Sequence, residues 1–213
     1  MTEAAAPRLA PTLPAAETTI TDELDLSGVE LGPETGVTGA AHVELLGCRL
    51  RGVRLTGCEF EQLRLVDVEF DDCELSGAGL HQATLTRVRF LRCRMVGLIG
   101  TAMRAKDVGL VDCRLDDANF RMARLERWHV VDSDLRTADF GAAGLTDCRL
   151  LRCQLDGADF SRATLHEVRL HGSTLSGIKG AGSLGGAVIG SDQLAALAGP
   201  VLAAHGIVVD DED

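Results

Sequence analysis

The seven cysteines have the greatest capacity for chemistry in this sequence, because a thiolate can bind zinc or act as a nucleophile. No two of them have the C-x-x-C spacing typical of a zinc site. We therefore expect no metal site and no cofactor, and we expect buried, reduced thiols. Four should form a stacked ladder of free thiols, Cys73, Cys93, Cys113 and Cys153, and the other three are Cys48, Cys58 and Cys148.

The six histidines show no regular spacing, and none lies beside a serine or cysteine nucleophile in a recognisable motif. The glycines recur at turn positions without the pattern of a phosphate-binding loop, so corners of positive φ explain them. The sequence therefore predicts no catalytic residue, and we do not expect an enzyme.

The elements that carry these residues follow a five-residue period. From Leu45 to Leu175, 27 positions at five-residue spacing are almost all Leu, Phe, Met or Val, with Gly100 and Ala105 as the exceptions. A second column of small or apolar residues, two positions earlier, contains every cysteine. Two inward and three outward positions per five fit neither a helix nor simple strand alternation. The pattern predicts a chain that turns a corner every five residues and stacks its coils.

Several inward positions depart from the column. Leu98 and Met103 are larger than their neighbours in the second column, whereas Gly100 and Ala105, two positions later, are smaller than their neighbours in the first. We therefore expect these changes to compensate each other and keep the core volume constant. Trp128 is harder to fit inside, and we expect it to distort its coil or turn outward.

A further period of twenty, visible in Phe120, Phe140 and Phe160, indicates four quintets per coil. The segments Ala118-Asn119-Phe120, Ala138-Asp139-Phe140 and Ala158-Asp159-Phe160 match the pattern A-(D/N)-(L/F)-X-X, and residues 43–180 resemble the pentapeptide repeat family. The resemblance implies an all-β solenoid, a right-handed quadrilateral β-helix, roughly 30 Å long at about 4.8 Å per coil. Well-studied family members mimic DNA, bind DNA gyrase and protect it from quinolones, which implies gyrase binding as an alternative function.

We divide the chain into a flexible N-terminal tail (1–20), an N-terminal cap and loop (21–42), the β-helix (43–186) and a C-terminal segment (187–213). A break in the repeat register is expected at Gly32-Pro33. In the C-terminal segment, Ser191-Asp192 should cap a short helix that Pro200 kinks or splits and that His205-Gly206 ends. A short strand, Ile207 to Val209, and an acidic tail should follow.

This C-terminal segment is also a predicted homodimer interface, since its apolar surface exceeds what capping one end requires and some family members dimerise here. Capping alone is the alternative. The predicted dimerisation residues are Leu194, Leu197, Val201, Leu202, Ile207 and Val209.

The net charge of −11 is concentrated in the two ends of the chain. Residues 43–178 hold 20 acids against 19 basic residues, and none of the four predicted faces is strongly anionic. This distribution argues against rows of acids that imitate phosphates, and the acidic balance argues against direct binding of nucleic acid. No apolar run approaches the roughly 20 residues of a membrane helix, so we expect a cytoplasmic protein.

One outward column differs from the rest in being aliphatic over four successive coils: Leu91, Val111, Val131 and Leu151. Arginines flank it: Arg89, Arg92, Arg149 and Arg152. An apolar ridge bordered by arginine is typical of a protein interface. We therefore expect a non-enzymatic protein-interaction scaffold that binds its partner through this face. The alternative is that the stacked aliphatic residues only stabilise neighbouring strands.

Overall fold

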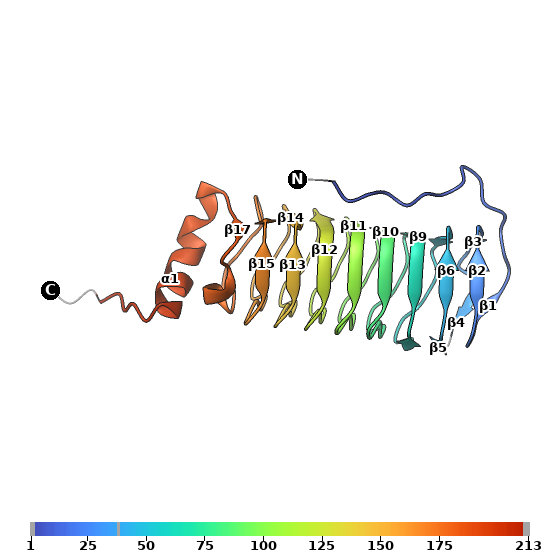
Figure 1. Ribbon diagram of the computed structural model, residues 1–213, viewed down its shortest axis with the longest axis horizontal. Helices are drawn as coiled ribbons and strands as arrows, with labels where there is room; N and C mark the ends of the chain where they lie inside the picture. The colour runs from blue at the N-terminus through green and yellow to red at the C-terminus, as the bar shows by residue number, and fades with distance from the viewer. Residues whose placement is uncertain (1–2, 38, 211–213) are drawn as a thin grey trace.

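The computed structural model describes residues 3–37 and 39–210. The chain winds into a long solenoid of about eight coils with one α-helix at its C-terminal end (Figure 1). Thirteen strands form one parallel sheet that follows the solenoid from end to end. The predicted fold class, an all-β right-handed quadrilateral β-helix with a short C-terminal helix, is confirmed.

The strands are short, except for four that pass over two adjacent faces. The strands of the N-terminal half are β1 (Thr19–Ile20), β2 (Asp25–Ser27), β3 (Glu30–Leu31), β4 (Gly36–Val37), β5 (Ala40–Ala41), β6 (Glu44–Leu46), β7 (Arg49–Arg51), β8 (Phe60–Glu61), β9 (Arg64–Asp71) and β10 (Thr84–Leu91). Those of the C-terminal half are β11 (Arg104–Val111), β12 (Arg124–Val131), β13 (Gly144–Thr146), β14 (Arg149–Leu151), β15 (Thr164–His166), β16 (Val168–Arg169) and β17 (Ala187–Val188). The helical elements are η1 (Ala181–Ser183), η2 (Ser191–Gln193) and α1 (Leu194–Ala204).

Paired residues of the central coils lie twenty positions apart, which confirms four quintets per coil, as in Leu85 with Ala105. Strands β9–β12 each turn a corner at a residue with positive φ. Those corner residues are Asp67, Arg87, Asp107 and Arg127, with φ of 55°, 52°, 57° and 49°. Because successive corners stack one coil apart, acidic and basic side chains alternate along one edge of the solenoid over these four coils.

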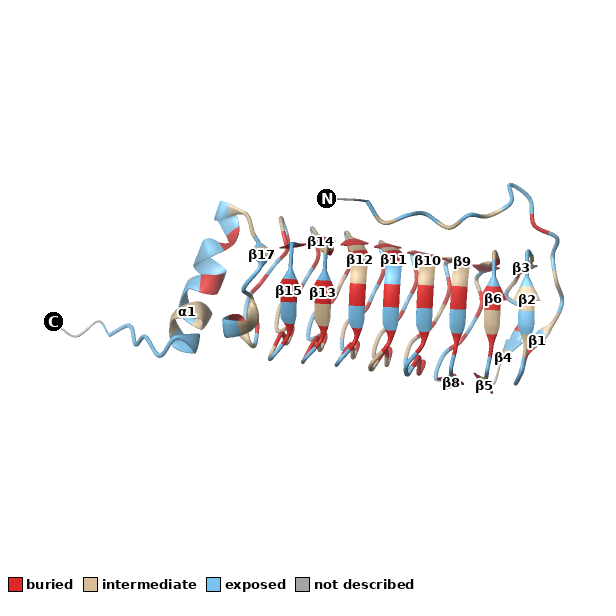
Figure 2. Cartoon of the chain, viewed as in Figure 1, coloured by how far each residue is buried: buried red, intermediate tan, exposed pale blue. Residues whose placement is uncertain are grey.

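The core lies inside the coils and is built from the two predicted inward columns (Figure 2). The phenylalanine rings stack along the axis, with centroids 5.4 Å apart for Phe120–Phe140 and 4.9 Å for Phe140–Phe160. The expectation for Trp128 is wrong: its side chain is buried, and β12 keeps its register through it. The indole packs edge-on against Phe120 and Phe140, so aromatic contacts accommodate it inside the coil.

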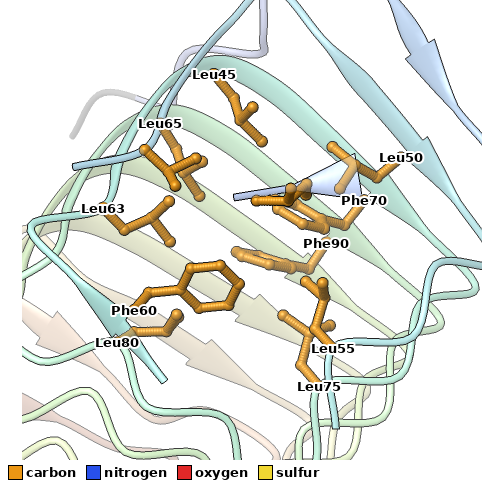
Figure 3. A pocket seen from close by; sticks show the side chains of 12 residues that line it. Leu45, Leu50, Leu55, Phe60, Leu63, Leu65, Phe70, Leu75, Leu80 and Phe90 are labelled. Carbon is orange, nitrogen blue, oxygen red and sulfur yellow. The ribbon is translucent and has the colours of Figure 1, made fainter. Parts of the chain in front are cut away.

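The core near its N-terminal end encloses a small cavity of about 20 Å³ (Figure 3). Leucine and phenylalanine side chains, among them Leu63, Phe60 and Phe90, point into it. A space of this size without polar partners stays dry and offers nothing to a polar ligand.

The missing side chain at Gly100 is compensated within the core, as predicted. A Cβ added to Gly100 would lie only 2.6 Å from Met103 Sδ and 3.2 Å from a Phe120 ring carbon. The thioether of Met103 therefore occupies the space that a leucine would fill at this point of the repeat.

This compensation predicts how substitutions at Met103 and Gly100 together change the free energy of unfolding. Met103→Ala should lower the free energy of unfolding by about 2–3 kcal/mol, because it leaves the space above Gly100 empty. Adding Gly100→Leu should restore part of that loss by refilling the space, as urea denaturation of the two variants would show. A double variant no more stable than Met103→Ala would contradict the volume exchange.

All seven cysteines are buried inward and free. The thiol of Cys73, for example, lies 3.4 Å from the Leu50 carbonyl and 3.5 Å from that of Asp71. Burial raises the pKa of Cys148 to about 12 and that of Cys153 to about 11. The thiols of Cys148 and Cys153 are therefore neutral near pH 7.

The segment expected to be an N-terminal cap forms a further coil. Leu26 pairs with Leu45 and Leu31 with Leu50, one residue short of the usual spacing of twenty. The pairing of Ala40 with Phe60 restores that spacing. The predicted register break after Leu31 is confirmed.

The C-terminal end of the solenoid is covered by α1 (Figure 2). Leu197 belongs to the core, and Val201 packs against it. The buried Gln193 donates through Nε2 to the carbonyls of Leu170 (2.7 Å) and Ser173 (2.6 Å). Since buried carbonyls need partners, Gln193 and the helix together cap the last coil.

Three details of this segment differ from expectation. Ile207 to Val209 form no strand and are exposed, because the last open sheet edge is already paired with β17, which precedes the helix. Ser191 is no N-cap: it begins η2, in which Gln193 Oε1 accepts the Gly190 N–H (2.7 Å). The helix α1 runs through Pro200 without being split. Gly206, with φ of 70°, ends it as predicted, and the acidic tail beyond Asp210 lies outside the described residues.

Candidate functional site

The predicted aliphatic ridge forms as one ladder on the surface. Leu91, Val111 and Val131 are paired residues of β10, β11 and β12, and Leu151 follows in β14. All four side chains are half-buried. We call the wall that bears them the ridge face. Its inward side chains are Leu50, Phe70, Phe90, Leu110, Val130, Leu150 and Leu170.

The four flanking arginines fall into two groups. Arg92 binds Asp71 and Asp72, and Arg152 binds Asp132 through two hydrogen bonds of 2.6 and 2.7 Å. Arg89 is exposed and makes no ion pair with any described residue, and the Nε of half-buried Arg149 has no hydrogen-bond partner among them. Among the four flanking arginines, Arg89 thus has an unpaired charge and Arg149 an unused hydrogen-bond donor with respect to the described residues.

The N-terminal tail lies along the ridge face, perpendicular to the strands (Figure 1). Its backbone N–H groups donate to three outward side chains: Ala4 to His129 Nδ1 (3.1 Å), Ala5 to Asp107 Oδ1 (3.2 Å) and Arg8 to Asp67 Oδ1 (2.9 Å). The wall thus supplies hydrogen-bond acceptors to residues 4–8 of the segment for which flexibility was expected.

Two of the three acceptors, Asp67 and Asp107, belong to the alternating corner column. Arg87 binds Asp67 through two hydrogen bonds of 2.6 Å, and Arg127 binds Asp107 through two of 2.6 and 2.9 Å. These arginines lower the pKa of both carboxyl groups, with smaller contributions from the tail N–H groups. The carboxylates therefore stay ionised at neutral pH and accept strong hydrogen bonds from the tail.

The third acceptor is a neutral imidazole. Burial, followed by the nearby charge of Arg149, lowers the pKa of His129. A neutral ring can keep Nδ1 free of a proton, as acceptance of the Ala4 N–H requires.

The ridge face is divided between a covered and an open part. Between the tail and the wall lies a hollow of about 320 Å³, lined by Ala4 and Pro7 on one side and by Arg89, Val111 and Val131 on the other. Farther toward the C-terminus, Arg149, Leu151, Arg169 and His171 line a second hollow of about 390 Å³, whose lining includes no tail residue.

Sequence reasoning found the ridge but missed the corner acceptors and their occupant. The alternation of acidic and basic residues at Asp67, Arg87, Asp107 and Arg127, twenty positions apart, was a readable signal. The tail carried none, because it binds through backbone N–H groups that almost every residue possesses.

The predicted dimerisation residues separate by exposure. Leu197 and Val201 contact the solenoid core and serve the cap. Leu202 is half-buried, whereas Leu194, Ile207 and Val209 are exposed at 59%, 51% and 70%. The exposed three are available to a second molecule.

Two further properties bear on the site. Among the described residues, no group of three His, Cys, Asp or Glu side chains is placed to hold a metal ion. No helix in the described part of the chain is long and apolar enough to cross a membrane.

Comparison with known proteins agrees with this architecture. The family of pentapeptide repeats (8 copies) matches residues 54–91, and the pentapeptide repeat region family matches residues 103–179. No curated protein matches the chain in sequence.

Two solved structures of QnrB1, a plasmid-mediated fluoroquinolone resistance protein, share the fold. Both are trypsin-treated forms of single-substitution variants. One aligns with a TM-score of 0.50 and 18% identity over 89% of this chain and 99% of that one. The other aligns with a TM-score of 0.50 and 19% identity over 93% and 98%. Together with the two family matches, which cover more than half of the sequence, the repeat register shows that this chain belongs to the pentapeptide repeat family.

Proposed function

We propose that this protein is a non-enzymatic interaction scaffold that binds a protein partner through the ridge face. The observation that carries the proposal is the stacking of Leu91, Val111, Val131 and Leu151 in one ladder beside Arg89 and Arg149. Aliphatic contact area with arginine at its border is the composition of an interface core. The tail already lying against Val111 and Val131 supports the proposal, since it is a polypeptide that fits this wall.

A pair of charge insertions tests this proposal. In the Val111→Asp/Val131→Asp variant, two carboxylates enter the ridge, so capture of the partner from a lysate of the source cells should fall at least tenfold. The melting temperature should change little, because both side chains point outward and are only half-buried.

The matched control is Val66→Asp/Val96→Asp, which makes the same two changes at half-buried outward sites on the two neighbouring faces. The control should retain binding. Equal capture by both double variants would show that the ridge only stabilises the strands.

Gyrase binding is the second candidate, supported by the family resemblance. The charge pattern disfavours the DNA-mimic form of it, because corner acids such as Asp67, Asp107 and Asp132 are neutralised by arginines. A supercoiling assay with purified DNA gyrase, with and without a quinolone, decides the matter: inhibition or protection by stoichiometric protein would establish gyrase as the partner.

We also propose that the protein forms a homodimer through its C-terminal end. Leu194, Ile207 and Val209 support this, since they remain exposed after Leu197 and Val201 have capped the solenoid. Light scattering of the full chain should give twice the monomer mass, and Leu194→Asp/Ile207→Asp should give the monomer. A monomeric wild-type protein leaves capping as the only role of the segment.

A further inference from the structure

The described part of the tail that meets the ridge face is an extended, small-residue peptide. Glu3, Ala5, Ala6 and Arg8 are exposed, whereas Ala4, Pro7 and Leu9 are half-buried. Three backbone hydrogen bonds hold it, and its side chains add little apolar area. It is therefore recognised through its backbone and shape rather than through large side chains.

The spacing of the wall matches the spacing of such a peptide. Coils repeat every ~4.8 Å, so two coils span about 9.6 Å. Three residues of extended chain span nearly the same length, at about 3.1–3.3 Å each. The N–H groups of Ala5 and Arg8, three residues apart, accordingly meet Asp107 and Asp67, two coils apart.

The alternation of charge at the corners produces this match. Aspartate occupies every second corner, at Asp67 and Asp107. Arg87, at the corner between them, holds the Asp67 carboxylate, and Arg127, at the corner after Asp107, holds the Asp107 carboxylate. The next corner of the series carries Asp147, whose buried Oδ1 has no hydrogen-bond partner within the described part of the chain. The wall thus offers a further acceptor at the same two-coil spacing.

We propose that the ridge face is a groove for an extended peptide of small residues, and that residues 3–9 occupy it in cis until an extended segment of the protein partner displaces them. This inference rests on the proposed function and adds its regulation and the kind of segment recognised. A tethered ligand acts at an effective concentration on the order of millimolar. The tail therefore lowers the apparent affinity of every competitor to its intrinsic affinity multiplied by the fraction of time that the groove is free.

Proline substitutions test, in the full-length chain, whether backbone hydrogen bonds hold residues 3–9 on the ridge face. Ala4→Pro/Ala5→Pro removes the two N–H donors that bind His129 and Asp107 and keeps the tail extended. Ala6→Pro is the matched control, because the Ala6 N–H makes no hydrogen bond within the described residues. Tryptic cleavage after Arg8 reports release, with each rate divided by that of a free peptide of the same sequence. The double variant should be cut about tenfold faster than the wild type, and the control should resemble the wild type.

Peptide binding tests the groove. The probe is a fluorescein-labelled peptide with the sequence of residues 2–10, titrated to millimolar protein by anisotropy. It should bind Ala4→Pro/Ala5→Pro about tenfold more tightly than the wild type or Ala6→Pro. Adding Val111→Asp/Val131→Asp to the double proline variant should abolish that binding.

Two outcomes would overturn the inference. Unchanged cleavage of Ala4→Pro/Ala5→Pro would show that these hydrogen bonds do not hold the tail. A released tail without peptide binding would show that the wall is no groove. Either result leaves the proposed function standing if Val111→Asp/Val131→Asp still loses the partner. Capture that survives those substitutions overturns the proposed function, and with it displacement of the tail by the partner, but not the binding of residues 3–9 to the ridge face.

Discussion

Raising the pH from 7.5 to 10 is expected to lower the free energy of unfolding by about 4 kcal/mol. The buried thiols cause this loss. A cysteine in the unfolded chain ionises near roughly pH 8.5, whereas the pKa of Cys153 is about 11 and that of Cys148 about 12 in the fold. Each such thiol therefore contributes stability that is complete below about pH 8.5 and is lost progressively as the pH rises toward its folded pKa.

The magnitude follows from these two thiols alone, since about 1.4 kcal/mol per pH unit for each gives about 4 kcal/mol at pH 10. Burial also raises the pKa of Cys48 and Cys58, which adds to the effect. The neighbouring thiols Cys73, Cys93 and Cys113 shift in opposite directions, since the pKa of Cys93 is raised and those of Cys73 and Cys113 are lowered, so their contributions partly offset each other. Other side-chain types titrate little in this range, because the chain has no tyrosine and only Lys106 and Lys179 as lysines.

Urea denaturation at a series of pH values measures the effect. Cys148→Ala/Cys153→Ala is the control, and its stability should fall less steeply above pH 8.5. A wild-type stability that is flat between pH 8 and 10 would contradict the burial of neutral thiols, as would rapid reaction of the native protein with a thiol reagent.

Phe140→Ala should be the most damaging single substitution in the core, at about 3–5 kcal/mol. The ring is fully buried between Phe120 and Phe160 and also meets the edge of Trp128, so its removal leaves a cavity and breaks three aromatic contacts. Thermal or urea unfolding would measure the loss.

A matched control for this change is Met122→Ala, which truncates a side chain that is 55% exposed and should cost little. A loss below about 1 kcal/mol for Phe140→Ala would contradict the close stacking of the rings.

The repeat was the part of the fold that sequence could predict, because inward positions such as Phe120 and Phe140 need an apolar side chain in every coil. The sequence did not predict which of two segments would pair with the last edge of the sheet. Ile207 to Val209 have strand propensity, but Ala187–Val188 occupies the edge that they would need. Trp128 was misjudged because its fit depends on the positions of Phe120 and Phe140, which a period alone does not describe.

The candidate site, too, was predictable from the sequence only in part. Leu91, Val111, Val131 and Leu151 could be placed on one line because register follows from the period of twenty. The route of the tail depends on backbone donors at Ala4, Ala5 and Arg8, which leave no mark in residue type.

Site-specific photo-cross-linking in the source cells tests most directly whether the ridge face is the docking surface. A photoreactive phenylalanine in place of Leu151 lies on the ridge at the hollow without tail residues, and one in place of Val96 lies on a neighbouring face. The proposal predicts one discrete cross-linked partner from position 151 and none from position 96. No product at position 151, or the same product from both positions, would contradict it.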